Sequence, residues 1–137
     1  MRIKTTKHDR RFSELIRLRD DVCQMCGRAG RTECSHVYSR RHKSIRWDTR
    51  NAFAACHQCH RHWHSNPLLS HEWLEATIGE KQVTMLRLMA NTTSKAPTKA
   101  VLDLIYSEMK EEIEYLKSIP AEERQNLQFR YRYRVAV

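Results

Sequence analysis

The chain has 137 residues, of which only 40% are hydrophobic, and its mean hydropathy is -0.75. We therefore expect one domain, with or without an appendage, whose small core needs a metal or a partner for stability. No apolar run approaches the roughly 20 residues of a membrane span, which argues against a membrane protein. The formal net charge is +9, because residues 1–70 hold 15 lysines and arginines against 6 acidic residues, whereas residues 71–137 hold 10 of each.

The first part of the chain is expected to form a short helix and then a loop. Residues 8–21 are amphipathic, with an apolar face that the aliphatic stem of an arginine extends. That face consists of Phe12, Leu15, Ile16 and Arg19. Residues 22–35 contain a Cys-x2-Cys pair among polar residues, which predicts a metal knuckle followed by a polar loop.

Two short strands and a second helix are expected next. Apolar residues separated by polar ones over residues 36–54 predict two strands joined by the basic loop 39–44. Residues 57–64 are expected to open a helix. Asn66-Pro67 ends it, because the residue before a proline is pushed out of the helical region.

The C-terminal half is predicted to be mainly helical. The three helices expected there cover residues 70–78, 80–91 and 98–118, and the last has the clearest apolar periodicity. Ser70 is the expected cap of the first, Gly79 its end, and Pro120 closes the last. In the tail, residues 128–137 alternate aromatic or apolar residues with arginine, which predicts a strand.

Two Cys-x2-Cys pairs, Cys23/Cys26 and Cys56/Cys59, are separated by 29 residues. Each pair can present two thiolates to one ion, and four thiolates complete the tetrahedral coordination that Zn²⁺ prefers. Gly27 suits the tight turn of such a knuckle. A site closed by four cysteines has no open position for water, so we predict a structural Zn²⁺. A redox dithiol is the alternative, but neither pair lies in a thioredoxin-like βαβ pattern.

The cysteines also bear on location. The N-terminus has no apolar signal region, so a cytoplasmic, reducing compartment is the default expectation. In such a compartment cysteines more often bind metals or stay free than form disulfides. Cys34 is the odd cysteine, which we interpret as a small buried residue or free thiol, with contact to a catalytic metal as the alternative.

Histidines concentrate between and just after the two cysteine pairs. Of the eight in the chain, this zone holds His36, His57, His60, His62 and His64. His60 and His64 stand four residues apart, which on a helix places both imidazoles on one face, where they can share one divalent ion. Phosphodiester cleavage needs an activated water, a metal on the leaving oxygen and cations on the phosphate, and this segment offers all three.

The order His36, Asn51, His60 and His64, with intervals of 15, 9 and 4 residues, resembles the ββα-metal motif of HNH (His-Me finger) endonucleases, as in colicin-type members. The stretch AACHQCH resembles the zinc-ribbon variety of this family, and SHVYSRRHK through HRHW, followed by NP and HEW, is similar to phage proteins of the NinG/Rap recombination family. The resemblance covers about residues 20–75.

The resemblance implies an α+β fold. Residues 1–75 would form a small ββα-metal (HNH) nuclease core with the N-terminal helix and the four-Cys zinc site, and residues 76–137 a mainly helical C-terminal extension. The apolar face of helix 98–118 must pack on this core or on a second copy of the chain. A homodimer would place two active sites on a duplex or a four-way junction.

The resemblance also implies roles for the motif residues. His36 corresponds to the general base that activates water, and Asn51 to the residue that holds this base in place. His60 corresponds to a ligand of a catalytic divalent ion (Mg²⁺, Mn²⁺, Ni²⁺ or Zn²⁺), with His64 a second ligand. Because a base must be neutral, activity is expected to fall below about pH 6.

The motif does not specify the third metal ligand or the phosphate contacts as closely as it specifies the base and the two histidine ligands. In the family the residue before the base is commonly Asp or His and binds the metal, whereas here it is Ser35, a weak neutral ligand. Water, Ser35 or Cys34 can complete the site. Basic residues between the first histidine and the second cysteine pair are candidate phosphate anchors, with plain solvated charges as the alternative: Arg40, Arg41, Lys43, Arg46 and Arg50.

We therefore expect a metal-dependent endonuclease acting on duplex or branched DNA, in phage recombination or DNA processing, within the cytoplasm of a bacterial host if the chain is phage-encoded. The first alternative is a zinc-ribbon nucleic-acid-binding protein whose nuclease site has decayed, which Ser35 favours and the intact histidine spacing disfavours. The second is an RNA-directed nuclease.

Overall fold

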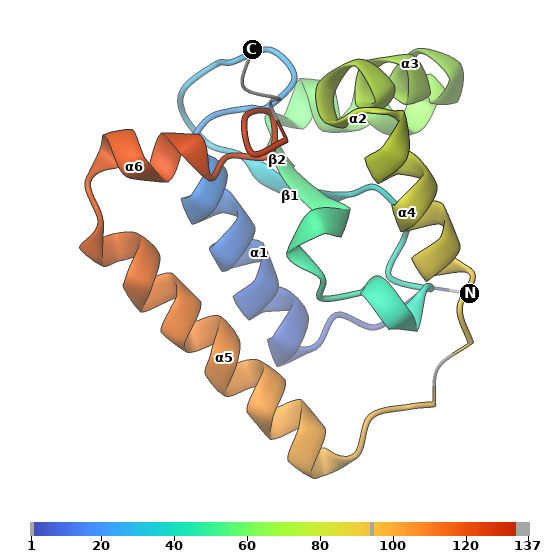
Figure 1. Cartoon of the computed structure of the whole chain (residues 1–137), viewed down its shortest axis with the longest axis vertical. Helices are drawn as coiled ribbons and strands as arrows, with labels where there is room; N and C mark the ends of the chain where they lie inside the picture. Colours follow the sequence, from blue (N-terminus) through green and yellow to red (C-terminus); the bar gives the residue numbers. More distant parts are fainter. Residues whose placement is uncertain (1, 94, 134–137) are drawn as a thin grey trace.

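In the computed structural model, which describes residues 2–93 and 95–133, helices surround a two-stranded antiparallel sheet. The fold is α+β and mostly helical, as expected (Figure 1). The elements in chain order are α1 (Lys7–Asp20), β1 (Glu33–His36), the 3-10 helices η1 (Lys43–Ile45) and η2 (Thr49–Asn51), β2 (Ala52–Ala55), α2 (His57–Ser65), α3 (Pro67–Ile78), α4 (Glu80–Ala90), α5 (Lys99–Ser118) and α6 (Ala121–Asn126).

The sheet pairs β1 with β2, so that Glu33 lies opposite Ala55 and His36 opposite Ala52. Two strands are found, but both are shifted from the predicted places. β1 begins three residues before the predicted range, within the segment expected to be a loop, and shares only His36 with it. β2 begins only at Ala52, because the 3-10 helices η1 and η2 occupy much of the stretch predicted for the second strand. The sequence Glu-Cys-Ser-His carries no strand-like alternation. Its conformation is set by pairing with β2, all four residues of which are fully buried, so tertiary contacts outweigh local preference here.

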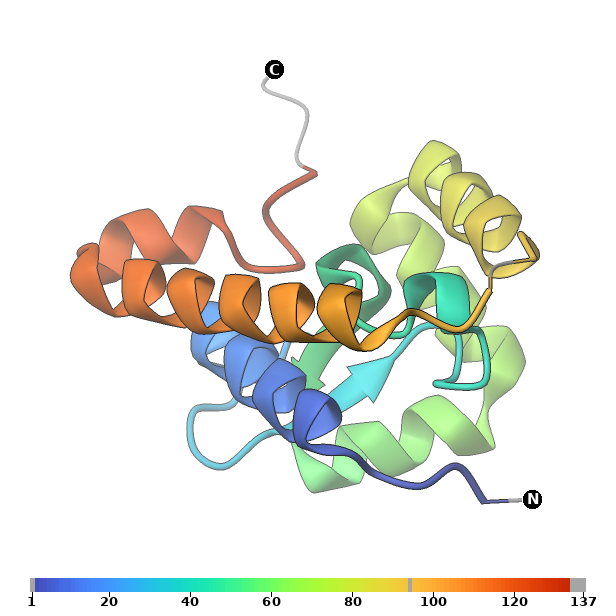
Figure 2. The same cartoon turned by 90° about the horizontal axis from the view of Figure 1, so that it is seen from below.

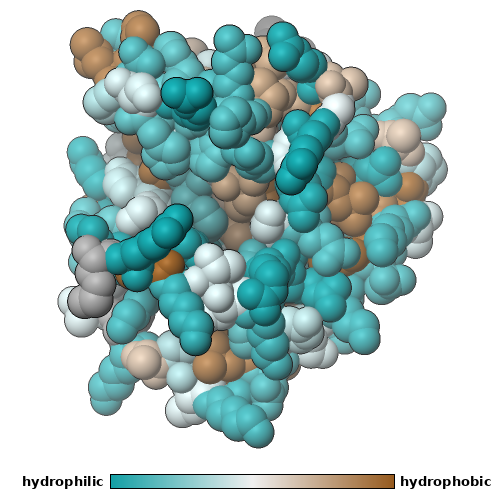
Figure 3. Space-filling model, turned by 180° about the vertical axis from the view of Figure 1, so that it is seen from behind, coloured by the Kyte–Doolittle hydropathy of each residue, from teal (hydrophilic) through white to brown (hydrophobic). Residues whose placement is uncertain are grey.

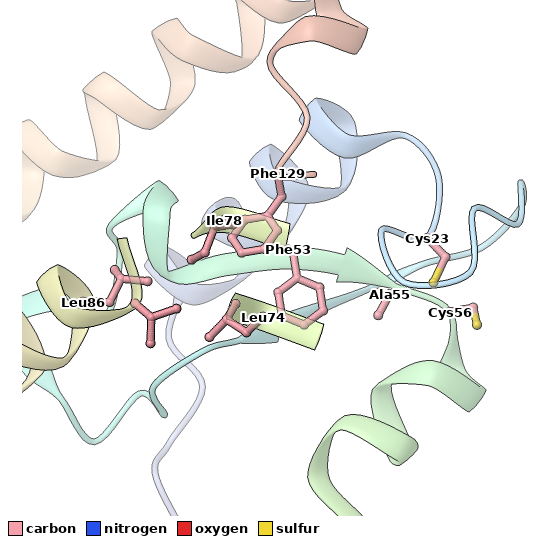
Figure 4. Packing of buried hydrophobic residues seen from close by; sticks show 9 residues of the cluster. Cys23, Phe53, Ala55, Cys56, Leu74, Ile78, Leu86 and Phe129 are labelled. Atoms are coloured by element: carbon pink, nitrogen blue, oxygen red, sulfur yellow. The ribbon is translucent and has the colours of Figure 1, made fainter. Parts of the chain in front are cut away.

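Two hydrophobic clusters lie on the two sides of the sheet. On one side α1 and α5 run side by side, as Figure 2 shows, and their buried side chains form one cluster with Ala52. On the other side Phe53 and Ala55 pack with side chains of α3 and α4 and with Phe129, as Figure 4 shows. The apolar face of α5, made of Met109, Ile113 and Leu116, is therefore covered by α1 of the same chain.

The predicted helices are found at nearly the predicted places, with one error at a helix start. A capping box between Thr6 and Asp9 begins α1, and Gly79, with φ +89°, ends α3 as predicted. However, Ser70 is not a cap: α3 begins at Pro67, whose fixed φ suits the first helical turn. Ser70 lies inside the helix, where its buried hydroxyl donates to the carbonyl of Trp63 (2.9 Å).

The predicted C-terminal strand is wrong over residues 128–133, which form turns; residues 134–137 lie outside the described part. Phe129 inserts its fully buried ring between the helices and the sheet. Its N–H donates to Asp20 (2.9 Å) and the N–H of Arg130 donates to Gln24 (2.9 Å), so side chains rather than a neighbouring strand satisfy this backbone.

The outer surface agrees with the composition. Figure 3 shows one face of the molecule, where hydrophilic side chains predominate and apolar ones form separate patches. None of the helices in the described ranges combines the length and the apolar character needed to cross a bilayer.

Candidate active site and metal centre

The four cysteines predicted as zinc ligands come together at one end of the sheet. Their sulfur atoms all lie within 4.8 Å of one another, and the Sγ atoms of Cys26 and Cys56 are 3.9 Å apart. Tetrahedral ligation at a Zn–S distance of about 2.3 Å separates sulfurs by about 3.8 Å. The cluster of Cys23, Cys26, Cys56 and Cys59 can therefore hold one zinc ion.

Local backbone geometry brings these thiols together. Gly27 adopts φ +76°, and the turn is closed by its N–H donating to the carbonyl of Cys23 (2.8 Å). Cys56 directly precedes α2, so Cys59 follows it within the first helical turn. Burial raises the pKa of the Cys23 thiol, but N–H groups of Cys26, Cys56 and Met25 outweigh it and lower that pKa to about 7. Burial and the neighbouring thiols raise the pKa of Cys59, so four thiolates side by side would need the charge of a bound cation.

A separate cleft of about 870 Å³ lies between α1, β1 and α2. Its lining includes all three histidines assigned to catalysis and metal binding, His36, His60 and His64. Arginines from α1 and from the loop before β1 also line it. The structure thus brings the three histidines and Arg40 to one cavity that is distinct from the cysteine cluster, whereas Asn51 and the other four predicted basic residues are not part of its lining.

The imidazoles of His60 and His64 point at each other across one turn of α2, with their Nε2 atoms 3.1 Å apart. Nδ1 of His60 donates to the carboxylate of Glu33 (2.8 Å), so Nε2 of His60 carries the lone pair. Two imidazole nitrogens bound to one ion at about 2.1 Å lie about 3.0 Å apart in octahedral geometry and about 3.4 Å apart in tetrahedral geometry. The pair therefore fits a shared divalent ion, and burial together with the charge of His60 lowers the pKa of His64, which favours its neutral, ligating form.

Glu33 is a residue that sequence reasoning missed. Its two carboxylate oxygens contact His60 and His57 (3.1 Å), and chiefly the hydrogen bond from His60 lowers the pKa of Glu33. A carboxylate behind a ligating imidazole fixes its tautomer and orientation. No signal in the sequence marks Glu33, because its role depends on the pairing of β1 with β2, which places Glu33 opposite Ala55, two residues before α2 begins.

His36 stands at the end of β1 with its ring against Phe12 (ring centroids 5.5 Å apart). Its Nε2 lies 3.2 Å from the carbonyl oxygen of Arg46. A carbonyl can only accept, so Nε2 carries the proton and Nδ1 is left as the acceptor. Burial, with a smaller contribution from the charges of Arg40 and Arg46, lowers the pKa of His36, so the ring is neutral at pH 7.

Asn51 is fully buried and bridges both ends of the loop that follows β1. Its Oδ1 accepts from the N–H of Tyr38 (2.8 Å), and its Nδ2 donates to the carbonyls of Tyr38 (2.8 Å) and Ile45 (3.2 Å). The next residue after Ile45 is Arg46, whose carbonyl accepts from His36. Asn51 therefore acts on His36 through the loop rather than by direct contact.

Three of the five candidate phosphate anchors are engaged within the protein. Arg40 and Arg46 pair with Asp9 (3.3 and 2.6 Å), and Arg50 pairs with Asp48 (2.7 Å). Burial alone would raise the pKa of Asp9, but its hydrogen bonds, the one from Arg46 foremost, hold that pKa far below its usual range. The remaining two anchors, Arg41 and Lys43, are exposed.

The two side chains considered for the third ligand position differ in placement. Ser35 is fully buried, its hydroxyl has no partner among the described residues, and it is not part of the cleft lining. Cys34 does line the cleft, but burial raises the pKa of its thiol to about 12. A protonated thiol is a poor ligand, so neither side chain is placed as a ready third ligand.

Comparisons with known protein families, with curated proteins and with solved structures found no match. The case for a function therefore depends on the chemistry of the cleft itself. The cleft combines a neutral imidazole, whose Nδ1 has no partner among the described residues, with two convergent imidazoles and several arginines. Such groups can accept a proton from water, share a divalent ion and bind an anion.

Proposed function

We propose that the chain is a metal-dependent DNA endonuclease of the HNH type, acting on duplex or branched DNA in recombination or DNA processing. The observation that carries this proposal is the shared cleft of His36 and the convergent pair His60 and His64. The succession β1, β2 and α2, with the base on the first strand and the pair on the helix, supports a ββα-metal core. The four-cysteine zinc site would be purely structural.

In this mechanism Nδ1 of His36 takes a proton from the attacking water. The carbonyl of Arg46 keeps the ring in the required tautomer, and Asn51 keeps the loop that carries this carbonyl in place. His60 and His64 would hold the divalent ion, with Glu33 behind His60. When bound, Mg²⁺, Mn²⁺, Ni²⁺ or Zn²⁺ supplies the charge that stabilises the phosphate and the leaving 3′ oxygen.

A cleavage assay on duplex, nicked and four-way DNA tests the proposal, with Mg²⁺, Mn²⁺ or Ni²⁺ added to protein that keeps its structural zinc and has been freed of loosely bound ions by gel filtration. We expect cleavage with at least one ion, and a loss of about 10²- to 10⁴-fold in His36→Ala. His62→Ala is the matched control, because His62 lies on α2, is exposed and contacts Asn66 rather than the cleft. Binding without cleavage by the wild type would instead support the zinc-ribbon binding protein.

The rate of cleavage is expected to have an acid limb set by His36. Because burial lowers the pKa of His36 below its ordinary 6.5, the base stays neutral at pH 7 and becomes protonated only on further acidification. Activity should therefore be flat near neutrality and fall below about pH 6. Single-turnover rates from about pH 5 to 8 measure this, and the limb should not move when the metal concentration is raised. A limb above pH 7 would contradict the assignment.

Glu33→Gln is expected to weaken binding of the catalytic ion by about 10- to 100-fold, because the amide is a weaker acceptor for the N–H of His60. Calorimetric titration with Mn²⁺ or Ni²⁺ measures this independently of turnover. The matched control is Glu75→Gln, which removes a carboxylate from an equally short contact with His71 (2.8 Å) on α3. Equal metal affinity in both variants would show that Glu33 has no such role.

A further inference from the structure

Three arginines on the lining of the cleft have no acidic partner among the described residues. Arg10 and Arg17 lie on α1, Arg31 lies in the loop before β1, and all three are exposed. Arg17 contacts only the hydroxyl of Ser13 (3.1 Å), itself a lining residue. Their positive charge is therefore available to an anion, in contrast to the paired arginines of the loop after β1.

The spacing of these side chains suits a phosphate backbone. Arg10, Ser13 and Arg17 recur at helical spacing on one face of α1. Arg10 and Arg17 are two turns apart, which is about 10 Å along the helix axis. Two charges this far apart can each reach a different phosphate of the same DNA strand.

We propose that Arg10, Arg17 and Arg31 form the phosphate-binding surface that seats one strand of duplex DNA across the cleft. This inference rests on the proposed function. It assigns the phosphate contacts to these three arginines instead of to Arg40 and Arg46. Arg40 and Arg46 hold the loop through Asp9, whereas α1 contacts the nucleic acid. An acidic protein would match the positive charge equally well. However, the three arginines line the same cleft as His36 and the His60/His64 pair, which are the groups proposed to hydrolyse phosphodiesters.

The test is binding of a fluorescent DNA duplex by the zinc-loaded protein in EGTA-buffered solution without added divalent ion, measured by anisotropy over a range of NaCl concentrations. Arg10→Gln/Arg17→Gln is expected to bind about tenfold more weakly near 0.1 M salt, and its log–log salt slope should fall by about 1.8. The matched control is Lys81→Gln/Arg87→Gln on α4, which removes the same charge from exposed positions outside the cleft and should change affinity by less than about twofold.

The outcomes separate this inference from the proposed function. If the wild type cleaves DNA but the α1 variant binds it with unchanged affinity and slope, the inference is wrong and the nuclease stands. If the α1 variant loses binding but the wild type never cleaves, the surface stands and the nuclease does not. Preferred binding of an RNA duplex of the same sequence, or equal losses in both double variants, overturns the inference. Unchanged thermal melting confirms that each variant is folded.

Discussion

Cys56→Ala is expected to abolish stoichiometric zinc binding and to unfold most of the chain. Cys56 lies in the hydrophobic cluster with Cys23, Phe53 and Leu74, so the ion and the core stabilise the same elements. Structural zinc contributes on the order of 10 kcal/mol in small zinc-bound folds, whereas the net stability of a domain is about 5–15 kcal/mol. Loss of the ion therefore removes most or all of the stability.

The matched control is Cys34→Ala, because Cys34 lies outside the four-cysteine cluster. It should lose only about 1 kcal/mol of packing and keep its zinc. Zinc content by elemental analysis and the far-ultraviolet circular dichroism signal measure both effects. Titration of the wild type with an organomercurial should release one zinc ion as four thiols react. A Cys56→Ala protein that melts like the wild type would show that the cluster is not a structural metal site.

Five of the six α-helices in the described ranges could be predicted from sequence because their signals are local. The short α6, which has no buried residue and no apolar face, was not predicted. The faces of α1 and α5 repeat apolar residues at helical spacing, and Pro67, Gly79 and Pro120 mark boundaries through their own backbone restrictions. The start of β1 and the turn around Phe129 could not be predicted in this way. Both depend on partners distant in the chain, β2 for Glu33–His36 and Asp20 for Phe129.

The residues of the candidate site also differ in whether a local sequence signal predicts them. The cysteine pairs and the pair His60 and His64 follow from spacings of three and four residues, and the structure does bring each set together. Glu33 and Asp9 gave no such signal, because a lone carboxylate acquires its role from what the fold places beside it. The sequence shows that Arg46 is positively charged, but it does not show that Arg46 pairs with Asp9, 37 positions away.

Asp20→Asn is expected to destabilise the fold by about 4 kcal/mol, because it leaves a buried guanidinium without its counter-charge. Asp20 is fully buried and accepts two hydrogen bonds from Arg19 (2.8 and 3.0 Å). It also accepts from the N–H groups of Ala54 (2.7 Å) and Phe129 (2.9 Å), which joins the end of α1 to β2 and to the C-terminal segment. The amide of asparagine cannot accept all four.

Asp21→Asn is the matched control, since the neighbouring residue undergoes the same chemical change in an exposed position. Asp21 has φ +64° and ψ -45°, a turn conformation that places the same demand on aspartate and asparagine, so the stability of Asp21→Asn should stay within about 0.5 kcal/mol of the wild type. Urea unfolding of the zinc-loaded proteins compares the two variants. Equal midpoints would mean that the Arg19–Asp20 pair contributes nothing to stability. A loss of stability confined to Asp20→Asn would show that one buried carboxylate attaches residues 128–130 to the core. Cys23 and Cys56 of the cysteine cluster belong to the same core.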